Sequence, residues 1–283
     1  MNMQRIKKYN FKRKAVTLFS LLTVLFFSSC EDVVNLDLET GEPRLVVDAE
    51  IIWTKGTSGN EQTIKISKTA PYYNNITPKV SGAQVRVENS NGDVFTFNET
   101  TPGSYVCTNF VPVINMDYVL YVTAEGQKFT AVEKLTSVTT IDKVEQNIVP
   151  DFGGKDIIEL TFFYKDPANE VNYYLTDYKS QFLLFPEYEL TYDEFFNGNL
   201  VSTRFSNEDM KAGNTVEITH RGISKNFYNY MNLILEASSA NPFSVVPGNI
   251  RGNIVNTDTS DSNNFALGYF RLCEADKVSY VVK

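Results

Sequence analysis

Four carboxylates between residues 187 and 194 have the side-chain types and spacing that best fit acid–base chemistry. They are Glu187, Glu189, Asp193 and Glu194. A glycoside hydrolase uses two such acids, one as the general acid and the other as the base or nucleophile. The same pattern is also typical of a solvated acidic loop, and we therefore predict no catalytic residue in this chain.

Aromatic side chains in the same segment are the candidates for contacts with a ligand or a partner protein. They are Phe185, Tyr188, Tyr192, Phe195 and Phe196. The alternative is that these rings only pack against the rest of the fold. We predict no cofactor and no metal site beside them.

The remaining residues that could do chemistry are few. His220 is the single histidine, so a histidine-rich zinc site or a Ser-His-Asp triad has little material, and we expect a histidine at the surface or at a strand end. The loop 256–264 offers oxygen ligands for calcium but lacks the order of an EF-hand loop. Cys107 and Cys273 could form a disulfide or serve as two small buried apolar residues.

An N-terminal segment predicts where the protein works. Six basic residues precede the apolar run 15–27, which has the length of a signal-peptide core and is shorter than the roughly 20 residues of a spanning helix. Ser28-Ser29-Cys30 then resembles a lipobox, although Phe27 stands where leucine is usual. We therefore expect residues 1–29 to be removed and Cys30 to carry lipid. Ordinary secretion with a free cysteine is the alternative.

The residues after Cys30 predict an acidic tether over 30–43. Its first two acids, Glu31 and Asp32, look like the signals that route some Gram-negative lipoproteins to the cell surface, and chance acids in a solvated tether are the alternative. Removal of 1–29 takes away six basic and no acidic residues, which leaves 20 Lys and Arg against 34 Asp and Glu, a net charge near −14. Such a surface repels phosphate backbones, so nucleic acid is not an expected partner.

The first half of the mature chain, 44–140, has the pattern of an immunoglobulin-like or transthyretin-like β-sandwich. Short strands alternate apolar and polar residues, with turns about every ten residues. The clearest hairpin joins 83–88 to 94–97 through Asn91-Gly92, a pair suited to positive φ angles.

The second half, 141–283, predicts a β-rich domain with one covering helix at about 224–238. Phe227, Tyr230, Met231 and Ile234 recur at helical spacing on one face, and Ser224 is a suitable N-cap. We expect that face to pack on a sheet. The region 182–205 follows neither period.

Short motifs along the mature chain resemble one known family. They are Ser29-Cys30-Glu31-Asp32, 42–47, 118–131, 227–230, Asn241-Pro242-Phe243, 249–252 and Gly268-Tyr269-Phe270. The family is the lipoprotein family catalogued as domain of unknown function 4249, and this sequence carries a longer loop before Gly268. The resemblance implies an outer-membrane lipoprotein whose relatives are often encoded beside TonB-dependent receptors, and it implies no catalytic residues.

We therefore expect a non-enzymatic lipoprotein, anchored in the outer membrane through Cys30 and accessory to a TonB-dependent receptor in nutrient binding or uptake. Two alternatives stay open at this point. One is a surface glycan hydrolase that uses the carboxylates of 187–194, and the other is a structural lipoprotein in envelope assembly.

Overall fold

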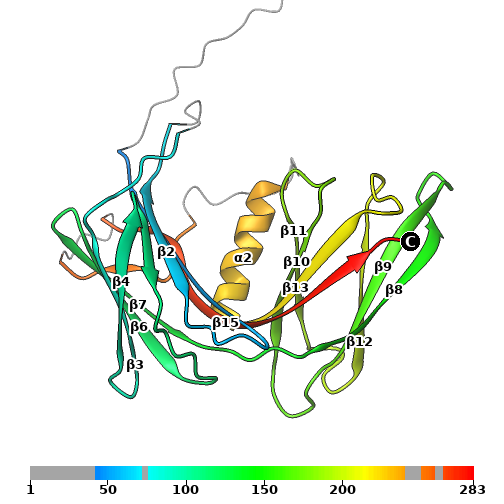
Figure 1. The fold of residues 1–283 in the computed structure, drawn as a ribbon, viewed down its shortest axis with the longest axis horizontal. Helices are drawn as coiled ribbons and strands as arrows, with labels where there is room; N and C mark the ends of the chain where they lie inside the picture. The colour runs from blue at the N-terminus through cyan, green and yellow to red at the C-terminus, as the bar shows by residue number, and fades with distance from the viewer. Residues whose placement is uncertain (1–41, 72–75, 240–249, 259–263) are drawn as a thin grey trace, which may run out of the picture. The chain divides into compact units, whose positions relative to one another are not determined.

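Strands dominate the fold, and the computed structural model describes residues 42–71, 76–239, 250–258 and 264–283. The predicted signal, Cys30 and the tether up to residue 41 lie outside the described residues, as do 259–263 of the polar loop. The elements, drawn in Figure 1, are β1 (Leu45–Thr54), β2 (Gln62–Lys68), β3 (Gln84–Asn89), β4 (Val94–Thr101), β5 (Ser104–Cys107), β6 (Asp117–Ala124), β7 (Gln127–Lys134), β8 (Ile141–Pro150), β9 (Asp156–Lys165), β10 (Tyr173–Lys179), β11 (Glu187–Tyr192), β12 (Leu200–Ser206), β13 (Thr215–Ile223), α2 (Lys225–Ser238), β14 (Val255–Asn256) and β15 (Leu267–Val281).

The strands form two sheets. Twelve strands follow one another in the order β11-β10-β13-β15-β1-β2-β5-β4-β3-β6-β7-β14, and β12-β9-β8 form the second sheet. Neighbouring strands pair antiparallel, except β1 and β15, the first and last of the described strands, which run parallel. The predicted class is confirmed: the described part of the chain is mainly β, with sandwich-like sheets and one helix toward the C-terminus.

Two large apolar clusters form the core. The first takes most of its side chains from β1 to β7, including Val47, Ile51 and Leu120, and the second takes them from residue 138 onward, including Phe162 and Tyr178. β15 packs Phe270 and Leu272 into the first cluster, and Val282, directly after β15, belongs to the second. The division of the chain near residue 140 stays a prediction, and β15 contacts both sides of it.

The segment that joins the two halves is held against the sheet. The Thr136 hydroxyl donates to the Gly222 carbonyl at 2.6 Å, and the Glu274 backbone N–H donates to the Thr136 carbonyl at 2.8 Å. A Cβ on Gly222 would lie 1.7 Å from the Ser137 carbonyl oxygen. Only glycine therefore allows this segment to cross β13 so closely.

The predicted hairpins are confirmed in detail. The Asn89 side chain closes the turn between β3 and β4, because its Oδ1 accepts from the backbone N–H groups of Asn91 and Asp93. Gly92 has φ 89°, in the region that glycine enters without steric cost. Glu125 and Gly126, with φ 52° and 78°, make the equivalent turn between β6 and β7.

Other elements differ from the sequence prediction. β8, β11 and β12 have no counterpart among the sequence predictions, and the chain ends in β15, a single strand of 15 residues. The helix is confirmed almost to the residue, with Ser224 as its N-cap. Among the described residues, no helix is long and apolar enough to cross a membrane.

Candidate functional site

Five charged side chains meet on one face of the twelve-stranded sheet. Residues that lie opposite each other in neighbouring strands share a face. Glu50 of β1 lies opposite Arg271 of β15. Ala275, four residues further along β15 and so on the same face, lies opposite Arg221 of β13, which in turn lies opposite Leu175 of β10. Leu175 and Phe227 of α2 belong to one apolar cluster, so this face also carries the helix, and we name it the helix face. Its ion cluster consists of Glu50, Asp177, Lys179, Arg221 and Arg271.

The charges of the ion cluster are paired in a chain that crosses four strands. Arg271 Nη2 forms an ion pair with Glu50 Oε2, and Arg221 Nη1 forms one with Asp177 Oδ1. Arg221 Nε lies 3.9 Å from Glu50 Oε1, and Lys179 Nζ lies 3.7 Å from Asp177 Oδ2. β1, β15, β13 and β10 are thereby linked through side chains as well as through backbone hydrogen bonds.

Burial makes this cluster costly unless its charges are matched. The side chains of Asp177 and Arg221 are 1% and 9% exposed, whereas those of Glu50 and Arg271 are 26% and 20% exposed. Burial alone would raise the pKa of Glu50, but Arg271 first and then Arg221 hold that pKa below its usual value. Among the described residues, Arg221 Nε, Arg271 Nε and Asp177 Oδ2 are buried without a hydrogen-bond partner. Buried charges whose hydrogen bonds are incomplete mark candidate functional sites.

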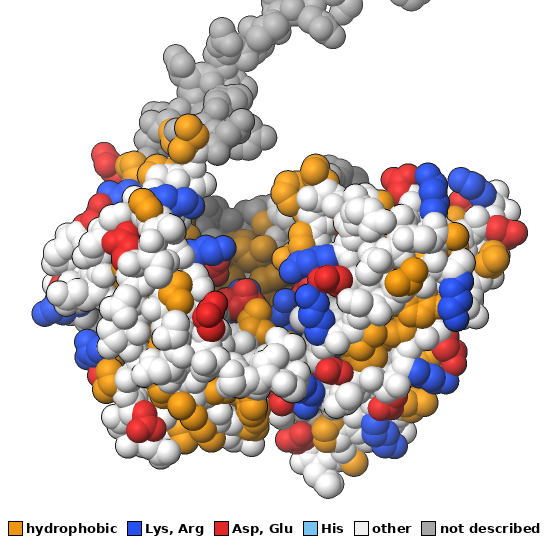
Figure 2. All heavy atoms as spheres, in the orientation of Figure 1, with side chains coloured by type: hydrophobic (Ala, Val, Ile, Leu, Met, Phe, Trp, Pro, Cys, Tyr) orange, Lys and Arg blue, Asp and Glu red, His pale blue; other side chains and the backbone are white. Residues whose placement is uncertain are grey.

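The helix borders the ion cluster on one side. The Arg271 guanidinium lies over the Phe227 ring, 4.7 Å from its centroid. Ser224 caps α2 by accepting from the Phe227 backbone N–H at 3.1 Å, and its hydroxyl donates to Glu133 of β7 at 3.0 Å. Figure 2 shows a hollow in the region where Figure 1 draws α2 and β15, with acidic and basic side chains gathered in it.

The structure separates the predicted contact aromatics into three groups. Tyr188 and Tyr192 lie on the helix face; Tyr188 is 44% exposed, opposite Asp177, and Tyr192 stacks on Tyr173 with ring centroids 5.5 Å apart. Phe185 and Phe195 are exposed at opposite ends of β11, a six-residue strand about 20 Å long. Phe196 is half-buried against the second core cluster. Tyr188 is thus the one of the five that borders the ion cluster.

The four carboxylates of the same segment have separate local partners. Glu189 Oε2 accepts from the Tyr178 hydroxyl at 3.0 Å, and Glu187 Oε1 accepts from Asn207 at 3.2 Å. Asp193 is buried and accepts from the Asn172 backbone N–H at 2.8 Å, which ties the end of β11 to the start of β10. Glu194 accepts from the Tyr192 hydroxyl, which raises the pKa of that phenol to about 12.

His220 is a core residue, and the prediction of a surface or strand-end histidine is wrong. It is 1% exposed within β13, stacks on Tyr174 and Tyr164, and shares a 2.9 Å hydrogen bond with the Thr176 hydroxyl through Nδ1. Burial first, and then the charge of Arg221, lower the pKa of His220 to about 3. The residue is therefore neutral at physiological pH.

Other candidates from the sequence take structural roles. Cys107 and Cys273 are both buried free thiols, and burial raises the pKa of Cys273 to about 12. Within the described ranges, no group of three or more His, Cys, Asp or Glu side chains could hold a metal ion. The proposed calcium ligands 259–263 lie outside the described residues.

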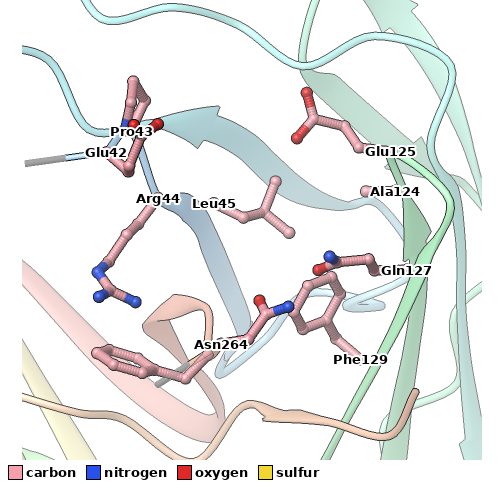
Figure 3. Close-up of a pocket in the computed structure, with 10 residues that line it drawn as sticks. Glu42, Pro43, Arg44, Leu45, Ala124, Glu125, Gln127, Phe129 and Asn264 are labelled. Atoms are coloured by element: carbon pink, nitrogen blue, oxygen red, sulfur yellow. The ribbon is translucent and has the colours of Figure 1, made fainter. Parts of the chain in front are cut away.

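A separate pocket of about 350 Å³ lies where β1 begins. In Figure 3 the Leu45 side chain points into the space between Glu125, Gln127 and Asn264. The guanidinium of Arg44 lies over the Phe265 ring, 4.3 Å from its centroid. The pocket mixes polar and apolar groups and lies at the point where the chain enters the fold.

Sequence reasoning did not identify the ion cluster. The available signal was a charged residue directly beside large apolar residues of a strand: Glu50 before Ile51 and Ile52, and Arg271 between Phe270 and Leu272. Such residues are rarely buried unless paired. Their partners come from distant parts of the chain, so no local pattern predicts which charges meet.

The fold and the site define a mainly β protein with sandwich-like sheets, one helix, and a buried ion cluster on the sheet face that carries the helix. The chain belongs to the family described as "Domain of unknown function (DUF4249)", whose profile matches residues 31–279, and the resemblance predicted from its short motifs is confirmed. No curated protein sequence matches it.

Solved structures similar to this chain include a fibronectin type-III segment. A two-domain segment of chicken tenascin is 13% identical, with a TM-score of 0.22, and the match covers 64% of this chain and 91% of that one. The FN1–FN3 domains of chicken CNTN1 are 15% identical, with a TM-score of 0.27, and the match covers 64% of this chain and 60% of that one. A cytokine receptor complex is 8% identical, with a TM-score of 0.25, and the match covers 63% of this chain and 82% of that one. Similarity at these TM-scores carries no conclusion about function.

Proposed function

We propose that this chain is a lipid-anchored lipoprotein of the outer membrane, without enzymatic activity, that serves a TonB-dependent receptor as an accessory subunit in nutrient binding or uptake. The observation that carries the proposal is the basic segment, the apolar run 15–27 and Ser28-Ser29-Cys30 in succession. The family match supports it, because it begins at residue 31, directly after the cysteine that would become the first residue.

Apolar side chains on the surface support a partner role. Leu184, Phe185 and Phe195 are 88%, 75% and 87% exposed in the two loops that flank β11. Leu184 and Phe185 are neighbours, and adjacent large apolar residues that are exposed are characteristic of contact surfaces, whereas Phe195 lies at the other end of β11. The link to TonB-dependent receptors comes from the family resemblance, whose members are often encoded beside such receptors.

Metabolic labelling with palmitate tests the anchor. We expect label on the wild-type chain and on Cys107→Ser, a matched control in which a buried cysteine is replaced. Cys30→Ser should carry no label and should leave the membrane fraction, because the acyl chains supply the anchoring free energy. Label that persists on Cys30→Ser would contradict the proposal.

One observation favours the alternative of a glycan hydrolase. Glu187 and Glu189 lie on the same face of β11, and burial raises the pKa of Glu189, as a general acid requires. Hydrogen bonds from Asn207 and Tyr178 give the same two groups a structural role. Turnover of surface glycans by the wild type that is lost in Glu187→Gln and Glu189→Gln would establish the enzyme and overturn the non-enzymatic proposal. An envelope-assembly role predicts neither turnover nor receptor binding.

A further inference from the structure

The ion cluster joins three positive side chains, Lys179, Arg221 and Arg271, to two carboxylates, Glu50 and Asp177. Two further acids share the helix face: Asp48, two residues before Glu50 on β1, and Glu217, opposite Lys179 on β13. The acids of this face therefore offset its positive charge. The feature that could take a small anion is the guanidinium pair itself, whose N–H groups bind the oxygens of an anion directly.

The hydrogen bonding of the two arginines is incomplete. The Nε–H groups of Arg221 and Arg271 have no partner among the described residues. In the part of the chain that the structure describes, Glu50 is the carboxylate that forms ion pairs with both guanidiniums, and its Oε1 lies 3.9 Å from Arg221 Nε, too far for a hydrogen bond. Each guanidinium therefore has one close carboxylate, Glu50 for Arg271 and Asp177 for Arg221, and keeps its Nε–H without a hydrogen bond.

A ligand could reach this place. Arg271 and Glu50 retain solvent exposure, and Tyr188 on the neighbouring strand is 44% exposed. Burial first, and then the charges of Asp177 and Glu50, raise the pKa of Tyr188, whereas Arg221 and Arg271 act in the opposite direction. The phenol therefore lies within electrostatic range of the cluster. The phenol offers a hydrogen-bond donor at the border of the site.

We propose that the ion cluster binds an oxyanion, the carboxylate or phosphate group of a small ligand, through Arg221 and Arg271, with Glu50 as the resident carboxylate that the ligand partly displaces. Guanidinium groups match the two oxygens of such anions bidentately. The inference deepens the proposed accessory function, because it names the chemistry of the nutrient that this site would take.

The cluster gives opposite expectations for its two partly exposed members. Glu50→Gln removes the competing carboxylate and should strengthen oxyanion binding by about 3- to 10-fold. Arg271→Gln removes a guanidinium and should weaken binding by at least about tenfold. Arg271→Lys keeps the charge and loses the bidentate geometry, so its affinity should lie between that of the wild type and that of Arg271→Gln. A purely structural ion pair predicts no such opposition.

Titration calorimetry on the full chain in detergent tests this with inorganic phosphate, triglycine and triglycine amide. Binding of phosphate alone identifies a phosphate site, and binding of triglycine but not its amide identifies a carboxylate site. Arg86→Gln, which removes an exposed arginine paired with Glu88 on β3, is the matched control and should bind like the wild type. Melting curves establish that each variant is folded. If Arg271→Gln does not fold, the affinity of Arg271→Lys takes its place in the comparison.

The proposal is overturned if the folded wild type binds neither phosphate nor triglycine. It is also overturned if Glu50→Gln and the arginine variants change affinity in the same direction, or if they bind like the wild type. Because the assay contains no receptor, a negative result leaves lipidation and receptor pairing to their own tests.

Discussion

Glu50 and Arg271 lie directly opposite each other in the parallel pair of β1 and β15, and their side chains form an ion pair. The first and last described strands of the fold are therefore joined through an ion pair as well as through a ladder of nine residue pairs. Arg221 extends this pairing to β13, and Asp177 extends it to β10. The helix face is therefore complete only with β15 in place beside β1.

Asp177→Ala should destabilise the protein by about 3–5 kcal/mol, because it leaves the buried Arg221 guanidinium without its counter-ion. Asp117→Ala is the control, since that carboxylate lies in an exposed pair with Lys134 and should cost less than about 1 kcal/mol. Urea denaturation of both variants gives the comparison. Equal midpoints for the two would show that the buried pair contributes nothing special.

Phe227→Ala should cost about 3–5 kcal/mol, because Phe227 is the buried residue of α2 and packs on Tyr269 with ring centroids 5.0 Å apart. Ile234, one turn from the end of the same face, is only half-buried and should cost about 1 kcal/mol as alanine. Melting curves of the two variants measure the difference. A larger loss for Ile234→Ala would mean that the C-terminal half of α2 carries the docking.

The stability of the wild type should fall as the pH drops below about 6.5. The folded pKa of His220, about 3, lies below its ordinary value of 6.5, so the unfolded chain binds a proton that the folded chain excludes. The contribution is complete above pH 6.5 and is lost toward pH 3, by at most about 1.4 kcal/mol per pH unit.

His220→Gln isolates this effect. Glutamine can still bond the Thr176 hydroxyl but cannot gain a proton, and the chain has no other histidine. Denaturation at pH 7.0, 6.0 and 5.5 should show a decline in the wild type and a flatter profile in the variant, whatever its absolute stability. Parallel profiles would mean that His220 is not the titrating group.

The fragment 44–140 should be less stable than the same segment inside the full chain. It lacks β15, which pairs with β1 and packs Phe270 and Leu272 into the first core cluster, each worth about 1.5–3 kcal/mol of burial. Joining residues 264–283 to the fragment through a flexible linker should raise its melting temperature. A fragment that melts cooperatively at the temperature of the full chain would show that this half needs no β15.

Local features of the fold were readable from the sequence because local chemistry determines them. The β3–β4 hairpin follows from Asn91-Gly92, and α2 follows from its N-cap and from the spacing of Phe227, Tyr230 and Met231. β11 does alternate, with Glu187, Glu189 and Thr191 on one face and Tyr188, Leu190 and Tyr192 on the other. The alternation covers only six residues, and the apolar residues just outside it, at 182–185 and 195–196, do not continue it, so the strand did not stand out from its surroundings.

The ion cluster was not predictable for a different reason. Its members come from β1, β10, β13 and β15, and the parallel pairing of β1 with β15 depends on tertiary contacts across the whole chain. The candidate aromatics were selected because they lie close together in the sequence. That criterion cannot distinguish Tyr188, which lies beside the charged residues, from Phe196, which packs against the core.

The most direct test of the proposed accessory role is affinity purification of the lipidated full chain from outer membranes solubilised in mild detergent, with partners identified by mass spectrometry. Leu184→Ser/Phe185→Ser, which removes exposed apolar side chains before β11, should reduce recovery of the partner without changing the melting temperature. The account predicts that a TonB-dependent receptor copurifies in roughly equal amount with the wild type. Recovery of the membrane-anchored chain without any such receptor would contradict it.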